Sequence, residues 1–383
     1  MLAGERRKIL FASTVAPTTR YFVLDQATFL QARGWDVHVV HSPDRDRSQE
    51  NWPFSVHEVS MRREISPIRD LRALLLMIRL IHRLKPQVIW SGTLKASLLS
   101  LFAGRLLRVR HRIYLVRGIR YEGTKGYERW LLKMAERLCC AFASDVIAVS
   151  ASVADLLVQD GVRKRPPLVL GRGASNGVDT RIFRPGISSR ENEFCGLETE
   201  STGVFVGFVG RLTPNKGLNI LIEAFQLARL KVPDLRLVLI GDVDYANRLS
   251  TRVLDCIQRC PDIHFLGKQA KEDIPALLRS LDMVVLPSLF REGLPNVLIE
   301  AAASGVPAIT TNSTGCRDAV LNEVTGLVVG VNDVAALAGA MVNLASDANY
   351  RHALGAAARV WALENFAQSI VWGNIEGFLG SLE

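Results

Sequence analysis

The feature that most constrains the fold is a regular alternation of short apolar strands with helical stretches. In the first half of the chain a helical pattern such as Tyr21–Arg33 separates one strand-like segment from the next, and the strand-like segments are 8–14, 35–40, 86–91, 111–116 and 145–150. This alternation is typical of βαβ units, whose strands form a parallel sheet. Turn-rich and then polar sequence interrupts the pattern between 171 and 203.

The alternation restarts after this interruption. Its strand-like segments are 203–210, 235–242, 263–267, 283–288 and 307–311. Helical patterns accompany them at 217–231, 246–259, 272–280, 295–304 and 346–383. We therefore predict an α/β fold with two doubly wound, Rossmann-like domains, over 1–185 and 203–360, joined by a linker at 186–202. A ligand is expected in the cleft between the two domains.

The composition is that of a globular protein long enough for two or three domains. Of 383 residues, 48% are hydrophobic and 22% are charged, which excludes a disordered chain, a coiled coil and a collagen-like rod. No uninterrupted apolar stretch reaches the ~18 residues of a spanning helix. The basic residues near the N-terminus lead into no signal-peptide core, so we expect a cytoplasmic protein.

The six cysteines show no spacing that indicates disulfides. Cys256, Cys260 and His264 are spaced by four, but a proline interrupts any helix there and no fourth ligand is near. Asp242 and Asp244 directly follow an apolar strand, which favours a turn over a divalent-metal site. We therefore expect no metal and no cofactor.

Charge divides the chain in two. Residues 1–185 carry 31 Lys and Arg against 16 Asp and Glu, a net charge of +15, whereas residues 186–383 carry a net charge of −6. This asymmetry indicates that one domain faces an anionic partner. Segments 68–84 and 94–112 mix arginines with aliphatic residues near helical spacing. Taken alone, each segment fits a core helix with a basic solvated face better than a membrane-binding helix. Taken together, they favour an anionic membrane surface as the partner. Nucleic acid is the weaker choice, because no nucleic-acid-binding signature is present.

The motif GVFVGFVGRLTPNKGLNILIE is the richest in the second half. A strand ends at Gly210, the following loop carries Arg211 and Lys216, and a helix begins after Gly217. A helix N-terminus offers free N–H groups to an anion, and two cations beside it can neutralise a diphosphate. The alternative is a surface loop that is basic by coincidence.

The motif LPSLFREGLPNVLIEAAASG follows another predicted strand. Glu292, Gly293 and Leu294 form a turn, and Pro295 begins a helix that contains Glu300. A glycine allows the backbone to approach a ligand closely, and a carboxylate can accept two hydrogen bonds from a diol such as that of ribose. We therefore expect this turn and helix to contact a nucleotide and its attached group.

With these motifs the sequence resembles the retaining GT-B glycosyltransferases of family 4, the glycosyltransferase group 1. The resemblance covers nearly the whole chain and rests on GFVGRLTPNKG, LVLIGD, FLG with EDIPALL, NGVDTRIFRPG and, above all, LPSLFREGLPNVLIEAAASGVPAI. STVAPTTRYF, IYLVRGIRYEG and TTNSTGCRDAV are similar to the branch that builds bacterial capsule, O-antigen and lipid-linked glycans. It implies a GT-B fold whose final helix, 361–383, crosses back to the first domain.

The resemblance also implies roles for matching residues. The second domain would bind the nucleotide sugar and the first domain the acceptor. Arg211 and Lys216 would clamp the donor diphosphate, Glu300 would bind the ribose hydroxyls, and the backbone at Gly267 would receive the base.

The donor sugar would be held by Glu292 with the backbone of Gly293 and Leu294. Where many relatives have a His in a V-H-G context, this chain has Arg117. An arginine cannot act as a base, but it offers fixed positive charge to a developing anion. Glu292 and Arg117 are therefore the candidate catalytic residues.

Together these expectations describe a retaining hexosyltransferase. It would move a sugar from a nucleotide diphosphate, with UDP favoured and GDP left open, to a polyprenyl-diphosphate-linked acceptor in polysaccharide or lipopolysaccharide biosynthesis. The basic first domain would rest on the inner face of the cell membrane. A transferase with a soluble acceptor and a sugar-nucleotide epimerase are alternatives on the same fold. A catalytically silent nucleotide- or lipid-binding scaffold is a third, because this chain lacks the histidines that many relatives have near 90–95 and at the position of Arg117. Loop 13–20 also lacks the glycine pair of many relatives.

Overall fold

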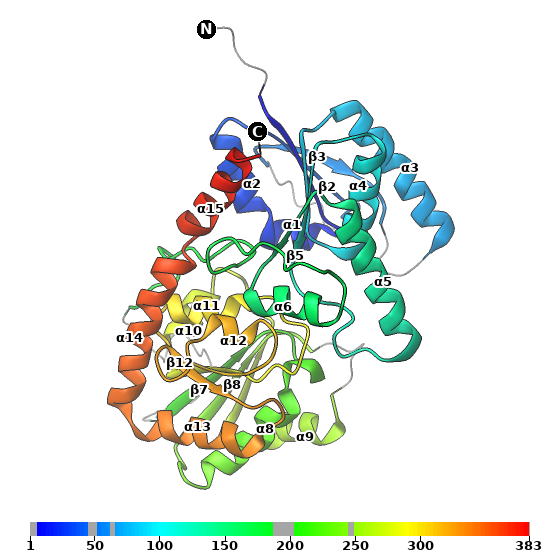
Figure 1. The fold of residues 1–383 in the computed structure, drawn as a ribbon. Coiled ribbons are helices and arrows are strands. Elements are labelled where there is room, and N and C mark those ends of the chain that lie inside the picture. The colour runs from blue at the N-terminus through cyan, green and yellow to red at the C-terminus, as the bar shows by residue number, and fades with distance from the viewer. Residues whose placement is uncertain (1–5, 45–51, 62–65, 187–202, 244–248, 383) are drawn as a thin grey trace. The chain divides into compact units, whose positions relative to one another are not determined.

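A computed structural model of the 383-residue chain describes residues 6–44, 52–61, 66–186, 203–243 and 249–382 (Figure 1). The chain divides into two compact units: unit 1 comprises Met1–Asn176 and Val371–Glu383, and unit 2 comprises Gly177–Ile370. This division falls earlier in the chain than the predicted boundary at 185, and it places the last part of the final helix with the first unit. All but the first residue of the predicted linker lies outside the described residues.

Unit 1 is built on a six-stranded parallel sheet, with strands β1 (Lys8–Ala12), β2 (Asp36–His41), β3 (Ser55–Glu58), β4 (Val88–Ser91), β5 (His111–Val116) and β6 (Asp145–Ala148). Their order across the sheet is β3-β2-β1-β4-β5-β6. The chain therefore runs outward from β1 in one direction, crosses over to β4, and runs outward in the other. This is the doubly wound arrangement that the sequence predicts.

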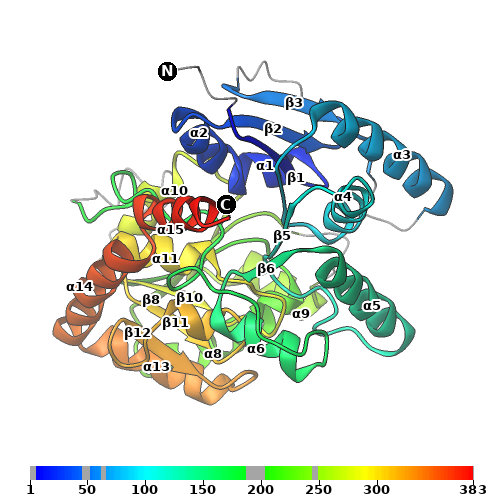
Figure 2. The same ribbon diagram turned by 45° about the horizontal axis from the view of Figure 1, so that its top comes forward.

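Helices cover both faces of this sheet. They are α1 (Ala16–Phe22), α2 (Leu24–Ala32), α3 (Pro67–Leu84), α4 (Leu94–Leu106), α5 (Gly126–Phe142), α6 (Ala151–Gln159) and α15 (Gln368–Gly380). In Figure 2, α3, α4 and α5 lie side by side on one face, and α3 and α5 both contact α4. On the opposite face α2 packs against α15, with the rings of Phe29 and Trp372 5.2 Å apart.

Burial of both faces explains why the strands are apolar at nearly every position. Leu10 of β1 belongs to the core under α3, α4 and α5. Its neighbour Phe11 points the other way, because successive side chains of a strand alternate between faces. There Phe11 contacts Trp90, which in turn packs against Phe378 of α15.

Unit 2 repeats the same sheet topology. Its strands are β7 (Val204–Val209), β8 (Leu235–Ile240), β9 (Ile263–Gly267), β10 (Met283–Leu286), β11 (Ala308–Thr311) and β12 (Gly326–Val329), in the order β12-β11-β10-β7-β8-β9. Its helices are the 3₁₀ turn η1 (Pro214–Lys216), α8 (Leu218–Arg229), α9 (Thr251–Arg259), α10 (Ile274–Arg279), α11 (Asn296–Ala303), α12 (Cys316–Ala319), α13 (Val334–Ser346) and α14 (Ala348–Asn365). The predicted α/β class is therefore confirmed for both units.

Several predicted elements were wrong in detail. The single helix expected over Tyr21–Arg33 is two helices, α1 and α2, which meet at Val23. The first of them begins earlier because Pro17 occupies its first turn, where the missing N–H costs nothing. The short strands β3 and β12 were not predicted at all. Both pair at an edge of their sheet, and most residues of β3 are exposed.

Among the described helices, none combines the length and the apolar character needed to cross a bilayer. The described residues also contain no group of three or more His, Cys, Asp or Glu side chains placed to hold a metal ion.

A buried carboxyl group lies within the core of unit 1. Glu136 of α5 is 1% exposed, and the Tyr114 hydroxyl of β5 donates a 2.6 Å hydrogen bond to it. Burial raises the pKa of Glu136 from 4.5 to about 7, and the Tyr114 hydrogen bond only partly opposes this. The folded state therefore holds a proton that the unfolded state has already released between those two pH values.

We predict that ionisation of Glu136 destabilises unit 1 as pH rises. The protonated carboxyl group makes its full contribution to the free energy of unfolding below about pH 4.5, and this contribution is lost as pH rises through about 7. Glu136→Gln keeps an oxygen acceptor for Tyr114 and removes the charge. Relative to this variant, the free energy of unfolding of the wild type should fall by roughly 1–3 kcal/mol between pH 5 and pH 8 in urea unfolding. The exposed Glu128→Gln on the same helix is the control; a pH-independent difference for Glu136→Gln would contradict the prediction.

Candidate functional site

In unit 2 the strand order reverses between β7 and β10, and parallel sheets bind ligands at such a switch point, outside the carboxyl ends of the strands. The loops that follow these two strands are held together. The Leu289 N–H donates to the Asn215 carbonyl oxygen at 2.9 Å. Gly217 has a φ of +75°, and a Cβ there would lie 1.9 Å from the Pro287 carbonyl oxygen. The start of α8 therefore passes the second loop at a distance that only glycine allows.

An ion pair joins the same two loops. Lys216 Nζ lies 2.5 Å from Glu292 Oε1, and the two side chains are only 20% and 9% exposed. Ser288, which is fully buried, donates a hydrogen bond of 2.8 Å to the same Glu292 oxygen. Because both charges are largely removed from water, each depends on the other far more than in an exposed pair. The pair therefore fixes the position of both side chains at the switch point.

The turn that follows Glu292 is also tightly packed. Gly315, which precedes α12, has a φ of +79°, and a Cβ there would lie 2.1 Å from the Gly293 carbonyl oxygen. Leu294 is 8% exposed. After it, Pro295 is the N-cap residue of α11. The backbone of Glu292, Gly293 and Leu294 is thus held between α11 and the glycine before α12.

Glu300 lies further along α11. Burial raises its pKa from 4.5 to about 7, and the nearby charge of Lys271 opposes that shift. A carboxyl group with this pKa is only partly ionised near neutral pH. A ligand that donates hydrogen bonds to the carboxylate would stabilise its ionised form.

Backbone of the neighbouring strands β7, β8 and β9 converges at the same edge of the sheet. A Cβ on Gly241, after β8, would lie 1.9 Å from the Gly210 carbonyl oxygen, and the Gly241 N–H donates to the Gly267 carbonyl oxygen at 2.8 Å. Gly267 itself has a φ of +66°. Arg211, the residue after Gly210, is exposed. The sheet therefore places the predicted residues Arg211 and Gly267 at the same edge as Lys216 and Glu292.

Arg117 belongs to unit 1, where it follows β5. Its guanidinium lies over the ring of Phe22, 5.4 Å from the centroid, and a Cβ on Gly92 would lie 2.9 Å from its Cζ. Its Nε and Nη1 are buried and have no hydrogen-bond partner among the described residues. Burial lowers its pKa to about 10, so the group is still charged at neutral pH. Buried N–H groups of a cation without an acceptor favour an anionic ligand.

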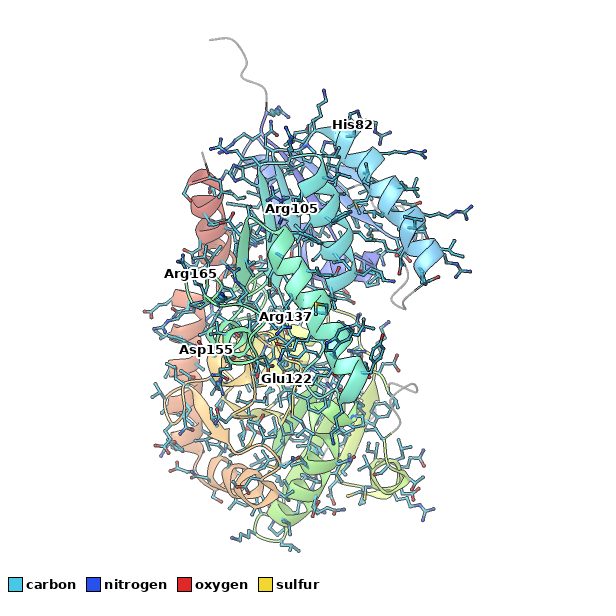
Figure 3. The ribbon with its side chains drawn as sticks, turned by 45° about the vertical axis from the view of Figure 1, so that its right-hand side comes forward. His82, Arg105, Glu122, Arg137, Asp155 and Arg165 are labelled. Carbon is cyan, nitrogen blue, oxygen red and sulfur yellow. The ribbon has the colours of Figure 1, made fainter. Side chains whose placement is uncertain are left out.

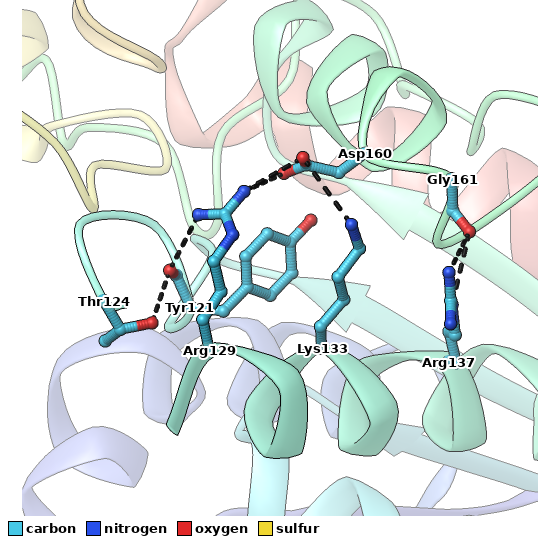
Figure 4. A network of polar contacts seen from close by, with 7 residues as sticks. All are labelled: Tyr121, Thr124, Arg129, Lys133, Arg137, Asp160 and Gly161. Carbon is cyan, nitrogen blue, oxygen red and sulfur yellow. Dashed lines mark hydrogen bonds and ion pairs between the residues drawn. The ribbon is translucent and has the colours of Figure 1, made fainter. Parts of the chain in front are cut away.

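A network of polar contacts holds the loop that follows Arg117 (Figure 4). The guanidinium of Arg129 lies over the Tyr121 ring at 5.3 Å and donates to the Tyr121 carbonyl oxygen at 3.3 Å. The Asp160 carboxylate accepts a bond from Arg129 at 3.0 Å and pairs with Lys133 at 3.7 Å. Arg137 donates to the carbonyl oxygen of the next residue, Gly161, at 3.0 Å. These α5 cations therefore stabilise unit 1 and are already partnered.

Two known protein families match the two halves of the chain. Residues 18–173 match the family described as "Glycosyl transferase 4-like domain", and residues 189–361 match "Glycosyl transferases group 1". The capsular polysaccharide biosynthesis glycosyltransferase CapM of Staphylococcus aureus is 32% identical over 92% of this chain and 91% of its own length. This chain is a group 1 glycosyltransferase.

One further relative of this group 1 glycosyltransferase and one solved structure of similar fold are informative. An Escherichia coli enzyme named UDP-Gal:alpha-D-GlcNAc-diphosphoundecaprenol alpha-1,3-galactosyltransferase is 29% identical over 74% of this chain and 73% of its own length. The Anabaena protein HepE, solved in complex with UDP and glucose, superposes with a TM-score of 0.81 at 23% identity, over 98% of this chain and 100% of that one. The two six-stranded sheets of this group 1 glycosyltransferase are thus those of the GT-B fold.

Sequence reasoning missed two residues of this group 1 glycosyltransferase. Ser288 lies two residues after β10 and donates a hydrogen bond to the catalytic candidate Glu292. Gly315 lies in TTNSTGCRDAV, a segment that carries the resemblance but had no assigned role. In both cases the signal was present, as a serine at a strand end and as a glycine before a short helix.

We predict that Lys216 and Glu292 are strongly coupled. Lys216→Met or Glu292→Gln alone removes one charge and leaves the other charge largely buried without its partner. The double variant removes both charges, so neither is left unpaired. The double variant should therefore lose less stability than the two single variants summed, by about 1–3 kcal/mol, in urea unfolding.

The pair Asp179–Arg181 is the matched control for this cycle. Its atoms are 2.8 Å apart, but the Arg181 side chain is 86% exposed, so its cycle should show no measurable coupling. Additive effects of Lys216→Met and Glu292→Gln would contradict the assignment of a functional ion pair.

Proposed function

We propose that this chain is a retaining hexosyltransferase that moves a sugar from UDP to a saccharide linked to a polyprenyl diphosphate. The observation that carries the donor side is the Lys216–Glu292 pair at the switch point of unit 2, beside the start of α8. The acceptor class is supported by the names of CapM and of the diphosphoundecaprenol galactosyltransferase. Unit 2 then binds the nucleotide sugar, and unit 1 binds the acceptor.

On this proposal each donor group meets a distinct part of the site. Arg211, Lys216 and the N–H groups at the start of α8 bind the diphosphate. The Glu300 carboxylate accepts two hydrogen bonds from the ribose diol, which favour its ionised form and return its pKa toward the ordinary value. The base lies against the backbone at Gly267, and Glu292 with its following turn holds the sugar.

The chemical step breaks the bond between the anomeric carbon and the diphosphate oxygen. Negative charge gathers on the departing diphosphate, and the cations of the site stabilise it without reorganising. The acceptor hydroxyl attacks from the face that the diphosphate leaves, so the anomeric configuration is retained, and its proton passes to the departing phosphate oxygen. Arg117 serves here as fixed positive charge, because it stays protonated at neutral pH and cannot accept that proton.

The outer face of α3 is the part of unit 1 that we assign to an anionic membrane surface, on the inner side of the cell membrane. It exposes four aliphatic side chains: Ile68 (78%), Leu71 (58%), Leu75 (50%) and Leu76 (44%). It also exposes four arginines, which have no ion-pair or hydrogen-bond partner among the described residues: Arg69, Arg72, Arg79 and Arg83. Its one acidic residue, Asp70, is paired with Lys95 at 2.9 Å. Apolar contact and uncompensated positive charge together favour interfacial binding.

We predict that transfer depends on UDP and on two residues of unit 2. Purified protein with a UDP-sugar and an undecaprenyl-diphosphate-linked saccharide should yield a lengthened lipid-linked product with a retained anomeric centre, observed by mass spectrometry and NMR. Lys216→Ala and Glu300→Ala should each lower kcat/KM at least tenfold. The exposed Glu223→Ala on α8 is the matched control and should leave the rate unchanged.

The same assay distinguishes the alternatives. An epimerase would convert the sugar nucleotide without an acceptor, and a transferase with a soluble acceptor would not need the lipid. Turnover with GDP-sugars but not with UDP-sugars would show that the donor nucleotide is GDP instead of UDP. The absence of both turnover and UDP-dependent thermal stabilisation would overturn the assignment as an enzyme. UDP at 100 times its Kd should raise the free energy of unfolding by about 2.7 kcal/mol.

We predict that α3 carries most of the membrane affinity. Leu71→Glu with Leu75→Glu should reduce binding to phosphatidylglycerol vesicles at least tenfold in flotation, because two apolar contacts are lost and two anionic charges are added. The control is Leu227→Glu with Leu230→Glu, which changes two exposed leucines of unit 2 that are 45% and 81% exposed. Equal losses in both variants, or no wild-type binding at low salt, would refute the role of α3.

A further inference from the structure

A second basic site lies at the opposite edge of the first sheet from Arg117. A cavity of about 480 Å³ opens there, where β4 and β5 begin and where α3 and α4 end. Its basic lining residues are Arg7, His82, Lys85, Arg108, Arg110 and His111, and none of the described residues that line it is a carboxylate. Figure 3 shows His82 at the end of α3. The proposed function uses the carboxyl ends of the strands and gives this cavity no role.

Two of these cations occupy strained backbone positions. Lys85, the C-cap residue of α3, has a φ of +49°, and Arg108, two residues after α4, has a φ of +56°. The left-handed region costs a non-glycine residue about 1 kcal/mol or more, so glycine usually takes such positions after a helix. Gly34 after α2 and Gly161 after α6 do so in this same unit. At the two helices that end on the cavity, the chain instead carries a cation.

Helix dipoles account for only part of this charge. The C-termini of α3 and α4 each bring about −0.5 of an elementary charge, which one cation between them offsets. Lys85, Arg108 and Arg7 supply three positive charges, more than the two helix termini offset. The environment of His111 agrees with an excess of positive charge: burial lowers its pKa first, and then Arg110, Arg7 and Arg112 lower it while Asp145 alone raises it.

The position of Arg7 is fixed by an aromatic contact. Its guanidinium lies over the ring of Trp35, 5.2 Å from the centroid. A guanidinium held in place can bind phosphate oxygens through two parallel hydrogen bonds, with less loss of side-chain freedom than a lysine. Arg7 therefore suits a ligand that carries phosphate.

We propose that this cavity binds a phosphate-bearing anion, either a soluble diphosphate or the head group of an anionic phospholipid. The volume suits a group of that size, and the positive charges of Lys85, Arg108 and Arg7, with no carboxylate among the described lining residues, match its charge. His82 and Lys85 lie at the end of α3, so the lipid source rests on the membrane role proposed for that helix. The soluble source does not depend on that role.

The test uses two probes and a variant that removes charge without straining the fold. Inorganic pyrophosphate is titrated by calorimetry with saturating UDP present, so that the proposed donor site is occupied, and phosphatidylglycerol vesicles are titrated by co-sedimentation, at one ionic strength. Lys85→Gly with Arg108→Gly removes two cations at positions whose φ favours glycine, so its unfolding midpoint should equal or exceed that of the wild type. The control, Lys164→Gln with Arg165→Gln, removes two exposed cations elsewhere in unit 1.

We expect the glycine variant to bind at least tenfold more weakly and the control less than threefold. Loss for pyrophosphate as well as for vesicles identifies a soluble diphosphate site, and loss for vesicles alone identifies a lipid head-group site. Equal weakening of glycine variant and control, or no binding of either probe to the wild type, overturns the proposal. Transfer to a detergent-solubilised acceptor should be unchanged in the glycine variant, so failure here is separable from failure of the proposed function.

Discussion

Each unit rests on a parallel sheet that is covered by helices on both faces, and this constraint decides where polar chemistry can occur. Charged side chains cannot lie against either face of such a sheet without losing water, so they gather at the ends of the strands. In unit 2 the loops at the carboxyl ends of β7 and β10 carry Lys216 and Glu292. In unit 1 the two opposite edges carry Arg117 and the basic cavity. The order of the strands thus fixes the candidate sites before any single residue is considered.

The Lys216–Glu292 pair has a consequence for how a donor would be received. The two charges cancel in the free protein, and the Ser288 hydroxyl further stabilises the carboxylate. A diphosphate would compete with Glu292 for the lysine, and the carboxylate would then need new donors, which sugar hydroxyls offer. Binding of the phosphates and of the sugar would in this way be linked through one ion pair. The packing of the two loops brings these residues, 76 positions apart in the sequence, to a distance of 2.5 Å.

Much of the fold could be predicted because buried parallel strands are continuous apolar runs. KILFA and VFVGFV have no other plausible environment, and both are central strands. The strand β3 could not be found in this way, since Ser55–Glu58 is polar, exposed and pairs on one side only. For the site, the residue types and their place after strands were readable, and the family resemblance supplied expected roles. Contacts made across loops were not readable, because Gly315 and Gly293, or Lys216 and Glu292, are joined by tertiary structure and by no local pattern.

The charge of unit 1 shows how structure refines a sequence count. A net charge of +15 over residues 1–185 implies a broad positive surface, yet its cations differ in what they contact. Arg129, Lys133 and Arg137 of α5 bind the end of α6, and Arg129 also binds the loop after Arg117. Arg112 donates to the Phe142 carbonyl oxygen. Such residues would be needed in the absence of any anionic partner. The arginines on the outer face of α3, and Lys85, Arg108 and Arg7 around the cavity where α3 and α4 end, have no carboxylate partner among the described residues. An anionic partner is therefore expected at that end of unit 1 rather than over its whole surface.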